Sequence, residues 1–265
     1  MAPSTSPDPH ADPSPADSSQ PAPTPLERDL GLRLLGESFF LQALDQLSVA
    51  ALEQPSPLPE WTRKHVALHV IFNGEGFLRL IDWAKTGTEN PMYPSREWRD
   101  AQIADAAGHM SGRDTIAIAH EVAEEITSEL ATMSDEQWSA PLVSGRGAAI
   151  TAADIPWLRA REAWVHSLDL GIGMSALDFP AAVIDRLLED VEAEWTLRGE
   201  PANFAVTLTD RPETGTVVIR TSDSAPEAPV TLTATAAEAF SYLSGRGWPT
   251  STEEPAGLPT PPPWL

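Results

Sequence analysis

Cysteine is absent from the 265-residue sequence. Its absence excludes disulfide bonds, cysteine-ligated zinc, iron–sulfur clusters and a cysteine nucleophile. Any metal ion must therefore be held by histidine, aspartate or glutamate side chains. Any thiol chemistry requires a thiol that comes from outside the chain.

Basic residues are also few: 17 Lys and Arg stand against 39 Asp and Glu, for a formal net charge of −22. This charge argues against nucleic acid and against anionic membrane surfaces as partners, because phosphates would repel it. No stretch reaches ~18 consecutive apolar residues, and the first 25 residues contain no apolar export signal. We therefore expect a cytoplasmic protein with no membrane partner. The sequence leaves the oligomeric state open, and a monomer is the simplest expectation.

Hydrophobic residues make up 42% of the chain, which is enough to build a core. Residues 1–25 are an exception, because they contain eight prolines and consist otherwise mainly of Ala, Ser, Asp and Thr. Proline removes backbone donors and blocks helix formation, and little apolar surface is available there for burial. The sequence predicts that residues 1–25 are a disordered tail without a catalytic role.

Apolar residues recur at helical spacing through the first half of the remaining chain. This periodicity predicts a helix from Leu26 to about Leu52, with a stripe that includes Leu34 and Leu35. Capping and breaking residues predict further helices and a shorter connecting one, at about 60–85, 95–107, 111–133 and 151–171. The four long helices fit a bundle. We place this bundle at residues 26–175.

The second half has a different pattern. One more helix is expected at 179–198, followed by β-branched, alternating runs near 204–209, 216–220 and 229–234. A short helix at 236–243 and a proline-rich end complete the chain. We expect an α+β protein in which residues 176–265 form a small α/β C-terminal domain.

Candidate metal ligands lie on two of the long helices. His65 and His69 are four residues apart and share one helix face, as do Glu162 and His166. The helix that carries Glu162 is apolar nearly all round, so its carboxylate must be paired, protonated or metal-bound. Glu162, His166 and one histidine of the other helix would form a His₂Glu site. Such a site leaves coordination positions open, as catalytic zinc sites do.

The same residues allow a structural explanation. Glu162 and His166 could simply be hydrogen bonded, and Arg159 or Arg161 could neutralise the carboxylate. Two glycine-flanked arginines, Arg146 and Arg246, are ordinary turn residues unless one of them reaches into a cleft and grips a carboxylate. Spacing alone does not decide between these possibilities.

Several segments resemble a known family. They are 61–73, 83–93 and 157–170, together with Gly245–Gly247 and the closing Pro261–Leu265. All of them are similar to the mycothiol-dependent maleylpyruvate isomerases of actinobacteria, in the same order along the chain. The resemblance runs from about residue 27 to the end.

The resemblance implies a DinB-like four-helix bundle followed by a smaller α/β domain. It places the zinc ligands on His69, Glu162 and His166, and the catalytic arginine on Arg246. His65 then becomes a packing residue, and Arg146 a turn residue. The implied cofactors are Zn²⁺ and mycothiol, and the implied substrate is maleylpyruvate, which would be isomerised to fumarylpyruvate downstream of gentisate in aromatic catabolism.

Two other functions remain open at this point. A mycothiol S-transferase would share the zinc ion and the thiol, but its product would retain the sulfur. A non-catalytic binding module would use zinc only to hold the bundle together. A site with three protein ligands rather than four argues against the second alternative.

Overall fold

The computed structural model of the chain describes residues 22–249 and 251–264. Most of the predicted disordered tail therefore lies outside the described residues. Its last residues are ordered: Thr24 caps the first helix, α1 (Pro25–Asp45), with its hydroxyl accepting from the backbone N–H of Glu27. The Glu27 carboxylate in turn accepts from the Thr24 backbone N–H, and this reciprocal pair fixes the start of the helix.

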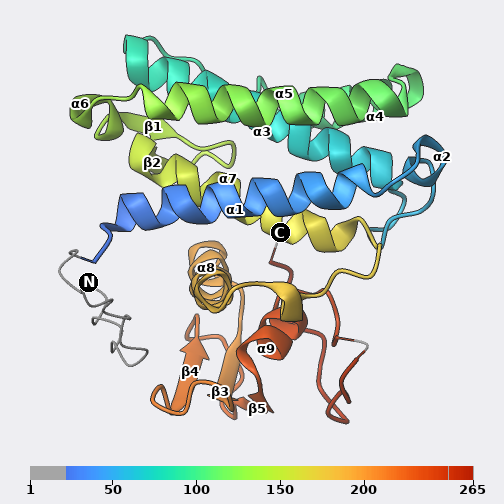
Figure 1. Cartoon of the computed structure of the whole chain (residues 1–265). Helices are drawn as coiled ribbons and strands as arrows, with labels where there is room; N and C mark the ends of the chain where they lie inside the picture. Colours follow the sequence, from blue (N-terminus) through green and yellow to red (C-terminus); the bar gives the residue numbers. More distant parts are fainter. Residues whose placement is uncertain (1–21, 250, 265) are drawn as a thin grey trace, which may run out of the picture.

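Four long helices form the bundle, as the sequence predicts. They are α1, α3 (Arg63–Thr86), α5 (Gly112–Ala131) and α7 (Ile155–Asp169). Helix α1 packs on α7 and α5, and α3 packs on the same two helices from the other side (Figure 1). Helix α3 ends close to the expected position. The residue that follows it, Gly87, adopts a φ of 70°, which a residue with a side chain rarely does.

The first helix is shorter than predicted. A continuous helix to Leu52 is wrong: α1 ends at Asp45, and a separate turn of helix, α2 (Val49–Leu52), follows. Ser48 causes the restart, because its backbone is extended and its hydroxyl accepts from the N–H of Ala51. Apolar spacing alone does not show such an interruption.

Shorter elements connect the long helices. They are α4 (Arg96–His109), α6 (Asp135–Trp138), the antiparallel hairpin of β1 (Pro141–Val143) and β2 (Ala149–Thr151), and the 3₁₀ turns η1 (Ala152–Asp154) and η2 (Ala176–Asp178). The predicted capping arrangement of Thr151 and Asp154 is present at the start of the segment that leads into α7. It fixes where the central helix begins.

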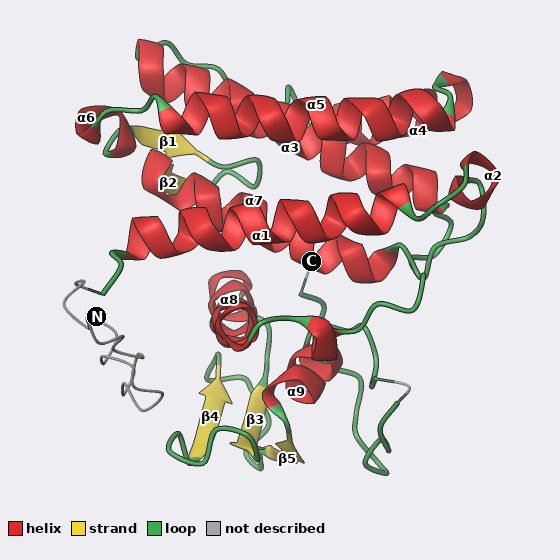
Figure 2. Cartoon of the chain, viewed as in Figure 1, coloured by secondary structure: helices red, strands yellow, loops and turns green. Residues whose placement is uncertain are grey.

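The C-terminal part contains α8 (Ala181–Arg198), β3 (Asn203–Leu208), β4 (Thr216–Arg220), β5 (Val230–Ala234) and α9 (Ala236–Leu243). Its sheet has the order β4–β3–β5, with β3 antiparallel to β4 and parallel to β5 (Figure 2). Helices and this small sheet together make the chain an α+β protein with a four-helix bundle, as predicted.

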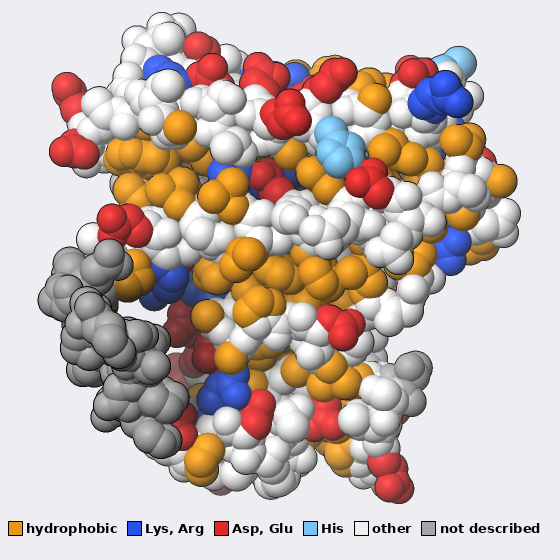
Figure 3. Space-filling model, viewed as in Figure 1, with side chains coloured by type: hydrophobic (Ala, Val, Ile, Leu, Met, Phe, Trp, Pro, Cys, Tyr) orange, Lys and Arg blue, Asp and Glu red, His pale blue; other side chains and the backbone are white. Residues whose placement is uncertain are grey.

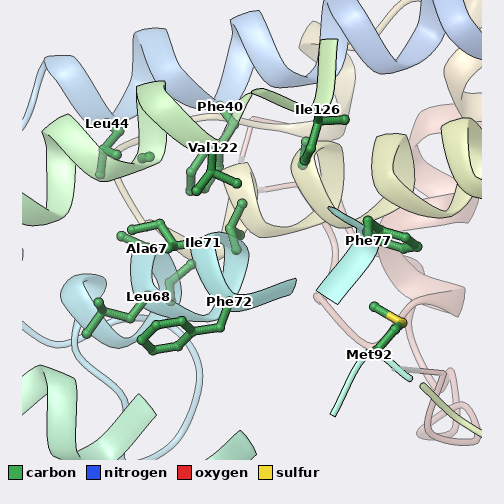
Figure 4. Packing of buried hydrophobic residues seen from close by; sticks show 14 of the residues in the cluster. Phe40, Leu44, Ala67, Leu68, Ile71, Phe72, Phe77, Met92, Val122 and Ile126 are labelled. Atoms are coloured by element: carbon green, nitrogen blue, oxygen red, sulfur yellow. The ribbon is translucent and has the colours of Figure 1, made fainter. Parts of the chain in front are cut away.

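Two hydrophobic clusters hold these parts together. The first lies inside the bundle, where Phe40, Ile71 and Val122 come from three different helices and their side chains meet (Figure 4). The second joins residues of α8, the sheet and α9 to Trp157 and Trp164 of α7. Helix α7 therefore belongs to both clusters, which fixes the C-terminal part against it. The division at residues 175 and 176 stays a prediction.

The buried face of α1 differs from the predicted stripe. Leu34 and Leu35 are about half exposed, whereas Arg33 and Glu37 are almost completely buried. Arg33 and Glu37 pair with one another, and Glu37 also pairs with Arg159 of α7. An ion-pair network, rather than leucine packing alone, therefore joins α1 to the centre of the bundle.

On the face shown in Figure 3, acidic side chains are spread over the upper and lower parts, and basic ones are confined to small groups. This distribution agrees with the net charge of −22. Within the described residues, every helix is too short or too polar to pass through a membrane.

Candidate metal centre

The three side chains expected as metal ligands meet between α3 and α7. His69 Nε2 lies 3.1 Å from Glu162 Oε2, and His166 Nε2 lies 3.4 Å from the same oxygen. One ligand atom from each side chain lies within 4.8 Å of the others. The two imidazole rings are nearly perpendicular, with centroids 4.5 Å apart. The helix turn between Glu162 and His166 thus sets two ligand positions, and α3 supplies the third.

Burial and mutual contact shift the pKa values of this group. Each of the three residues is exposed by no more than 8%. Burial, reinforced by the charge of His166, lowers the pKa of His69 and keeps its ring neutral. Burial also opposes ionisation of Glu162, but hydrogen bonds with His166 and His69 outweigh it and hold the Glu162 pKa well below its usual value. A neutral imidazole beside an ionised carboxylate is the state in which both groups ligate metals.

Behind His166 lies the carboxylate of Asp169, which was not among the expected site residues. Asp169 Oδ2 accepts from His166 Nδ1 at 2.8 Å. Nδ1 therefore carries a proton, and a metal ion would displace only the proton through which Nε2 contacts Glu162. Burial opposes the charge of Asp169, yet the bonds from His166 and Arg246 lower its pKa to about 2. The spacing of three residues from His166 on one helix was the available signal.

Arg246 reaches this carboxylate from the turn after α9. Its Nε lies 3.2 Å from Asp169 Oδ1 and its Nη2 lies 2.9 Å from Asp169 Oδ2, so the guanidinium binds the carboxylate with two bonds. Nη1 donates to the backbone oxygen of Ser244. Since a guanidinium has five N–H groups, one on Nη1 and one on Nη2 remain for a ligand. The structure thus places the predicted catalytic arginine two contacts away from a candidate metal ligand.

The other side of Glu162 faces Arg161. Arg161 Nη2 lies 3.6 Å from Glu162 Oε1, but its closest carboxylates are Asp190 and Glu194 of α8. Arg159, the other cation considered for this role, turns away and binds Glu37. Arg161 therefore contributes positive charge to Glu162 without satisfying it by itself, and Glu162 depends on the two histidines.

Tyr93 stands close to the same group. It belongs to the loop between α3 and α4, and its ring packs so closely on Gly76 and Gly145 that a Cβ at either glycine would lie 3.1–3.3 Å from it. Burial and the negative charge of Glu162 raise the pKa of Tyr93 to about 12. Its hydroxyl therefore stays protonated and available as a hydrogen-bond donor at neutral pH.

The remaining histidines lie away from this group. His65 sits in the first turn of α3, where Nδ1 is 2.7 Å from the Thr62 hydroxyl and completes the N-terminal cap. His109 and His120 are exposed, and His120 pairs with Asp45. His10 lies outside the described residues. Of the histidines that the structure describes, only His69 and His166 meet a carboxylate in the interior.

Two further arginines, Arg146 and Arg79, are engaged elsewhere. Arg146 lies in the turn of the β1–β2 hairpin and binds Glu194 of α8 at 2.7 Å. Arg79 donates to the backbone oxygen of Met92 at 2.7 Å. Arg146 therefore fixes the β1–β2 hairpin against α8. Arg79 fixes the loop that carries Tyr93.

The donor set fits a transition-metal ion. Two imidazoles and one carboxylate are ligands that zinc accepts, and three protein ligands leave room for a water molecule or a substrate. His69 Nδ1 is buried and has no hydrogen-bond partner among the described residues, so the ring is held only from its Nε2 side. An ion bound at Nε2 would complete that hold. The arrangement is therefore suited to Lewis-acid chemistry in a partly closed site.

Solved structures of known proteins are similar to this chain in fold. A crystal structure of the mycothiol-dependent maleylpyruvate isomerase superposes with a TM-score of 0.80 and 26% sequence identity, covering 91% of this chain and 98% of that one. A histidine-to-alanine mutant of that enzyme gives the same values. YfiT from Bacillus subtilis, a probable metal-dependent hydrolase with an unusual four-helix bundle topology, gives a TM-score of 0.47 at 16% identity, covering 57% of this chain and 88% of YfiT. No curated protein sequence matches the chain.

A family model also matches the sequence. The model describes the mycothiol maleylpyruvate isomerase N-terminal domain and covers residues 35–171. The matched region includes α3 and α7, the two helices that carry His69, Glu162 and His166. Because the match spans more than half of the 265 residues, this chain belongs to the mycothiol maleylpyruvate isomerase N-terminal domain family.

Proposed function

We propose that this protein is a zinc- and mycothiol-dependent maleylpyruvate isomerase, which converts maleylpyruvate to fumarylpyruvate in the breakdown of gentisate. The observation that carries the proposal is the buried group of His69, Glu162 and His166 in a chain without cysteine. Such a chain needs both a metal and an external thiol for this chemistry. The likeness to a maleylpyruvate isomerase over 91% of the chain supports the substrate.

His69, Glu162 and His166 would hold the zinc ion. When bound, zinc acts as a Lewis acid that lowers the pKa of a coordinated thiol, so that the thiol is ionised at neutral pH. The isomerisation itself needs reversible addition of a thiolate to the activated double bond, rotation about the resulting single bond, and elimination of the thiolate. Asp169 keeps the proton of His166 on Nδ1 throughout, so that the ring continues to present Nε2 to the site.

Arg246 would bind the carboxylate or the enolate-like oxygen of the substrate. Its two bonds to Asp169 fix the plane of the guanidinium, and the remaining N–H groups on Nη1 and Nη2 are the ones available for this contact. A rigid, charged donor can stabilise charge that develops as the thiolate adds. The protein is strongly acidic overall, so a dianionic substrate requires such a local cation.

Turnover of maleylpyruvate by the purified protein tests the proposal. We expect the zinc-loaded protein to form fumarylpyruvate only when mycothiol is present, and a chelator to abolish the reaction. 2-Mercaptoethanol at the same concentration is the control. It supplies a thiol without the rest of the mycothiol molecule, so it shows whether the protein recognises more than the thiol group. Absence of turnover in a sample with stoichiometric zinc and mycothiol would contradict the isomerase. A stable thioether formed with an electrophile would then identify an S-transferase.

Arg246→Ala should retain zinc yet lose about 2–4 kcal/mol of transition-state stabilisation, because it removes a charged donor. The loss should appear in kcat with maleylpyruvate, and elemental analysis of the same sample should show unchanged zinc. Arg246→Lys keeps the charge but not the two-bond contact with Asp169, so it should recover only part of the activity. Near-normal turnover in Arg246→Ala would show that this residue only shapes the turn.

Asp169→Asn should weaken zinc binding about 10- to 100-fold, because the neutral amide no longer fixes the proton of His166 on Nδ1. Competition with a chromogenic chelator measures this change directly. Asp185→Asn is the matched control, since Asp185 is a half-exposed carboxylate on α8 that binds Arg211 far from the ligands. Equal zinc affinity in the two variants would show that Asp169 does not act on the metal site.

A further inference from the structure

The closing segment of the chain packs against both halves of the molecule. It runs from the region of α9 up toward the bundle (Figure 1). Trp264 is 1% exposed and packs edge-on against Phe240, with ring centroids 5.5 Å apart. The proposed reaction gives no role to this tryptophan, although its segment is one of those that resemble the family.

Hydrogen bonds to proline backbone oxygens tie the segment to α8 and α9. Trp195 Nε1 donates to the backbone oxygens of Pro262 and Pro263, at 3.2 Å each. Arg198 also donates to the Pro263 oxygen, and the Tyr242 hydroxyl donates to that of Pro259. Proline restricts the backbone, so the segment is stiff. Trp264 is therefore presented to the bundle from a fixed support.

One edge of Trp264 connects to Glu162. Its Nε1 donates to Asp190 Oδ2 at 3.2 Å. The same carboxylate accepts from Arg161 Nη1 at 3.0 Å, and Arg161 Nη2 lies 3.6 Å from Glu162 Oε1. Trp157 Nε1 is a further donor to Asp190, at 3.0 Å. Asp190 thus collects three donors, and Trp264 fixes the side of it that faces the C-terminal segment.

The aromatic ring of Trp264 connects to His166 by a second path. The Arg246 guanidinium carbon lies 5.7 Å from the centroid of the indole ring, within the range of a cation–π contact. Arg246 binds Asp169, and Asp169 binds His166. Trp264 therefore contacts Arg246 directly and Arg161 through Asp190. Arg161 lies beside Glu162, and Arg246 is linked to His166 through Asp169.

We propose that Trp264 is a positioning residue that sets Arg246 and Arg161 around the metal centre. The proposal rests on the proposed function for its catalytic consequence. A guanidinium that must meet developing charge needs a fixed direction, and a desolvated aromatic face favours one placement of it. Removal of the ring leaves the bidentate contact of Arg246 with Asp169 but frees the arginine to rotate with that carboxylate.

Two substitutions separate the two contacts. Trp264→Leu removes both the ring over Arg246 and the donor to Asp190. Trp264→Phe keeps an aromatic face and removes only the donor. Phe204→Leu is the control, because Phe204 is 3% exposed in the same hydrophobic cluster, stacks on Trp195 and has no contact with either arginine. It reports the effect of lost aromatic packing in this cluster, including any loosening of Trp195, while Trp264 itself is intact.

We expect zinc-loaded Trp264→Leu to lose roughly tenfold in kcat with maleylpyruvate, with a smaller change in KM. Trp264→Phe should recover most of this loss, and Phe204→Leu should keep kcat within roughly twofold of the parent at a temperature where all variants are folded. Unchanged kcat in Trp264→Leu, or an equal loss in Phe204→Leu, would overturn the proposal.

Metal release gives a readout that is independent of the substrate. We expect zinc to leave Trp264→Leu several-fold faster than the parent or Phe204→Leu in excess chelator, because the partners of Glu162 and His166 are less fixed. The visible spectrum of the Co²⁺-loaded protein should shift in Trp264→Leu alone. If the parent protein does not isomerise maleylpyruvate, the proposed function fails. Unchanged release rates and spectra would then overturn the role of Trp264 separately.

Discussion

His166→Ala is expected to lose zinc and isomerase turnover together, while the bundle stays folded. The substitution removes one of three candidate ligands, and two ligands hold a catalytic zinc ion far more weakly. Asp169 keeps its two bonds from Arg246, and Glu162 keeps its contact with His69, so neither carboxylate is left alone. The cost in folding stability should therefore be limited to about 1–3 kcal/mol.

Elemental analysis after dialysis, maleylpyruvate turnover and far-UV circular dichroism should be measured on the same preparation of His166→Ala. His120→Ala is the matched control, because His120 is an exposed histidine on α5 that binds Asp45. That variant should retain both zinc and turnover. Stoichiometric zinc in His166→Ala would refute the assignment of the ligands.

The helices could be predicted well because their signals are local. The predicted end of α3 at about residue 85 is within one residue of Thr86, its predicted start at 60 is three residues before Arg63, and the Thr151–Asp154 capping arrangement precedes α7. The interruption of the first helix was missed for a related reason. Ser48 is an N-cap residue within a run of helical apolar spacing, and that spacing continues across the cap without a break.

The choice between His65 and His69 shows where spacing stops being informative. Both residues lie on one face of α3, and only the position of α7 distinguishes them. His65 is in the first turn, where Thr62 occupies its Nδ1, whereas His69 is one turn further along and meets Glu162. The family resemblance selected His69, which periodicity left undecided. The metal itself remains a proposal.

The environment of the ligands could be predicted least, since it depends on contacts distant in sequence. Arg246 lies 77 residues from Asp169, and Trp264 lies 74 residues from Asp190. The first contact requires the C-terminal part to pack on α7 through their shared hydrophobic cluster, and the second requires the closing segment to fold back onto α8. A local pattern contains no information about that packing. Asp169 is the exception, because its spacing from His166 was visible in the sequence.

Glu37→Ala is expected to destabilise the fold by about 3–5 kcal/mol, because it leaves buried cations without their counter-ion. Glu37 binds Arg33 through one oxygen and Arg159 Nε through the other, at 2.9 Å in the second case. All three side chains are exposed by 6% or less. Burial already lowers the pKa of Arg33, which shows that its charge is poorly solvated.

Urea unfolding of the zinc-loaded protein measures this loss. Glu37→Gln keeps the shape and one acceptor oxygen but not the charge. Its free energy of unfolding should therefore lie between that of the parent and that of Glu37→Ala. Glu129→Ala breaks the partly exposed pair with Lys85 and should cost less than about 1 kcal/mol. A Glu37→Ala protein as stable as Glu129→Ala would contradict the prediction. It would mean that the remaining acceptors satisfy both guanidinium groups, namely Thr127 for Arg33, and Val70 and Asn73 for Arg159.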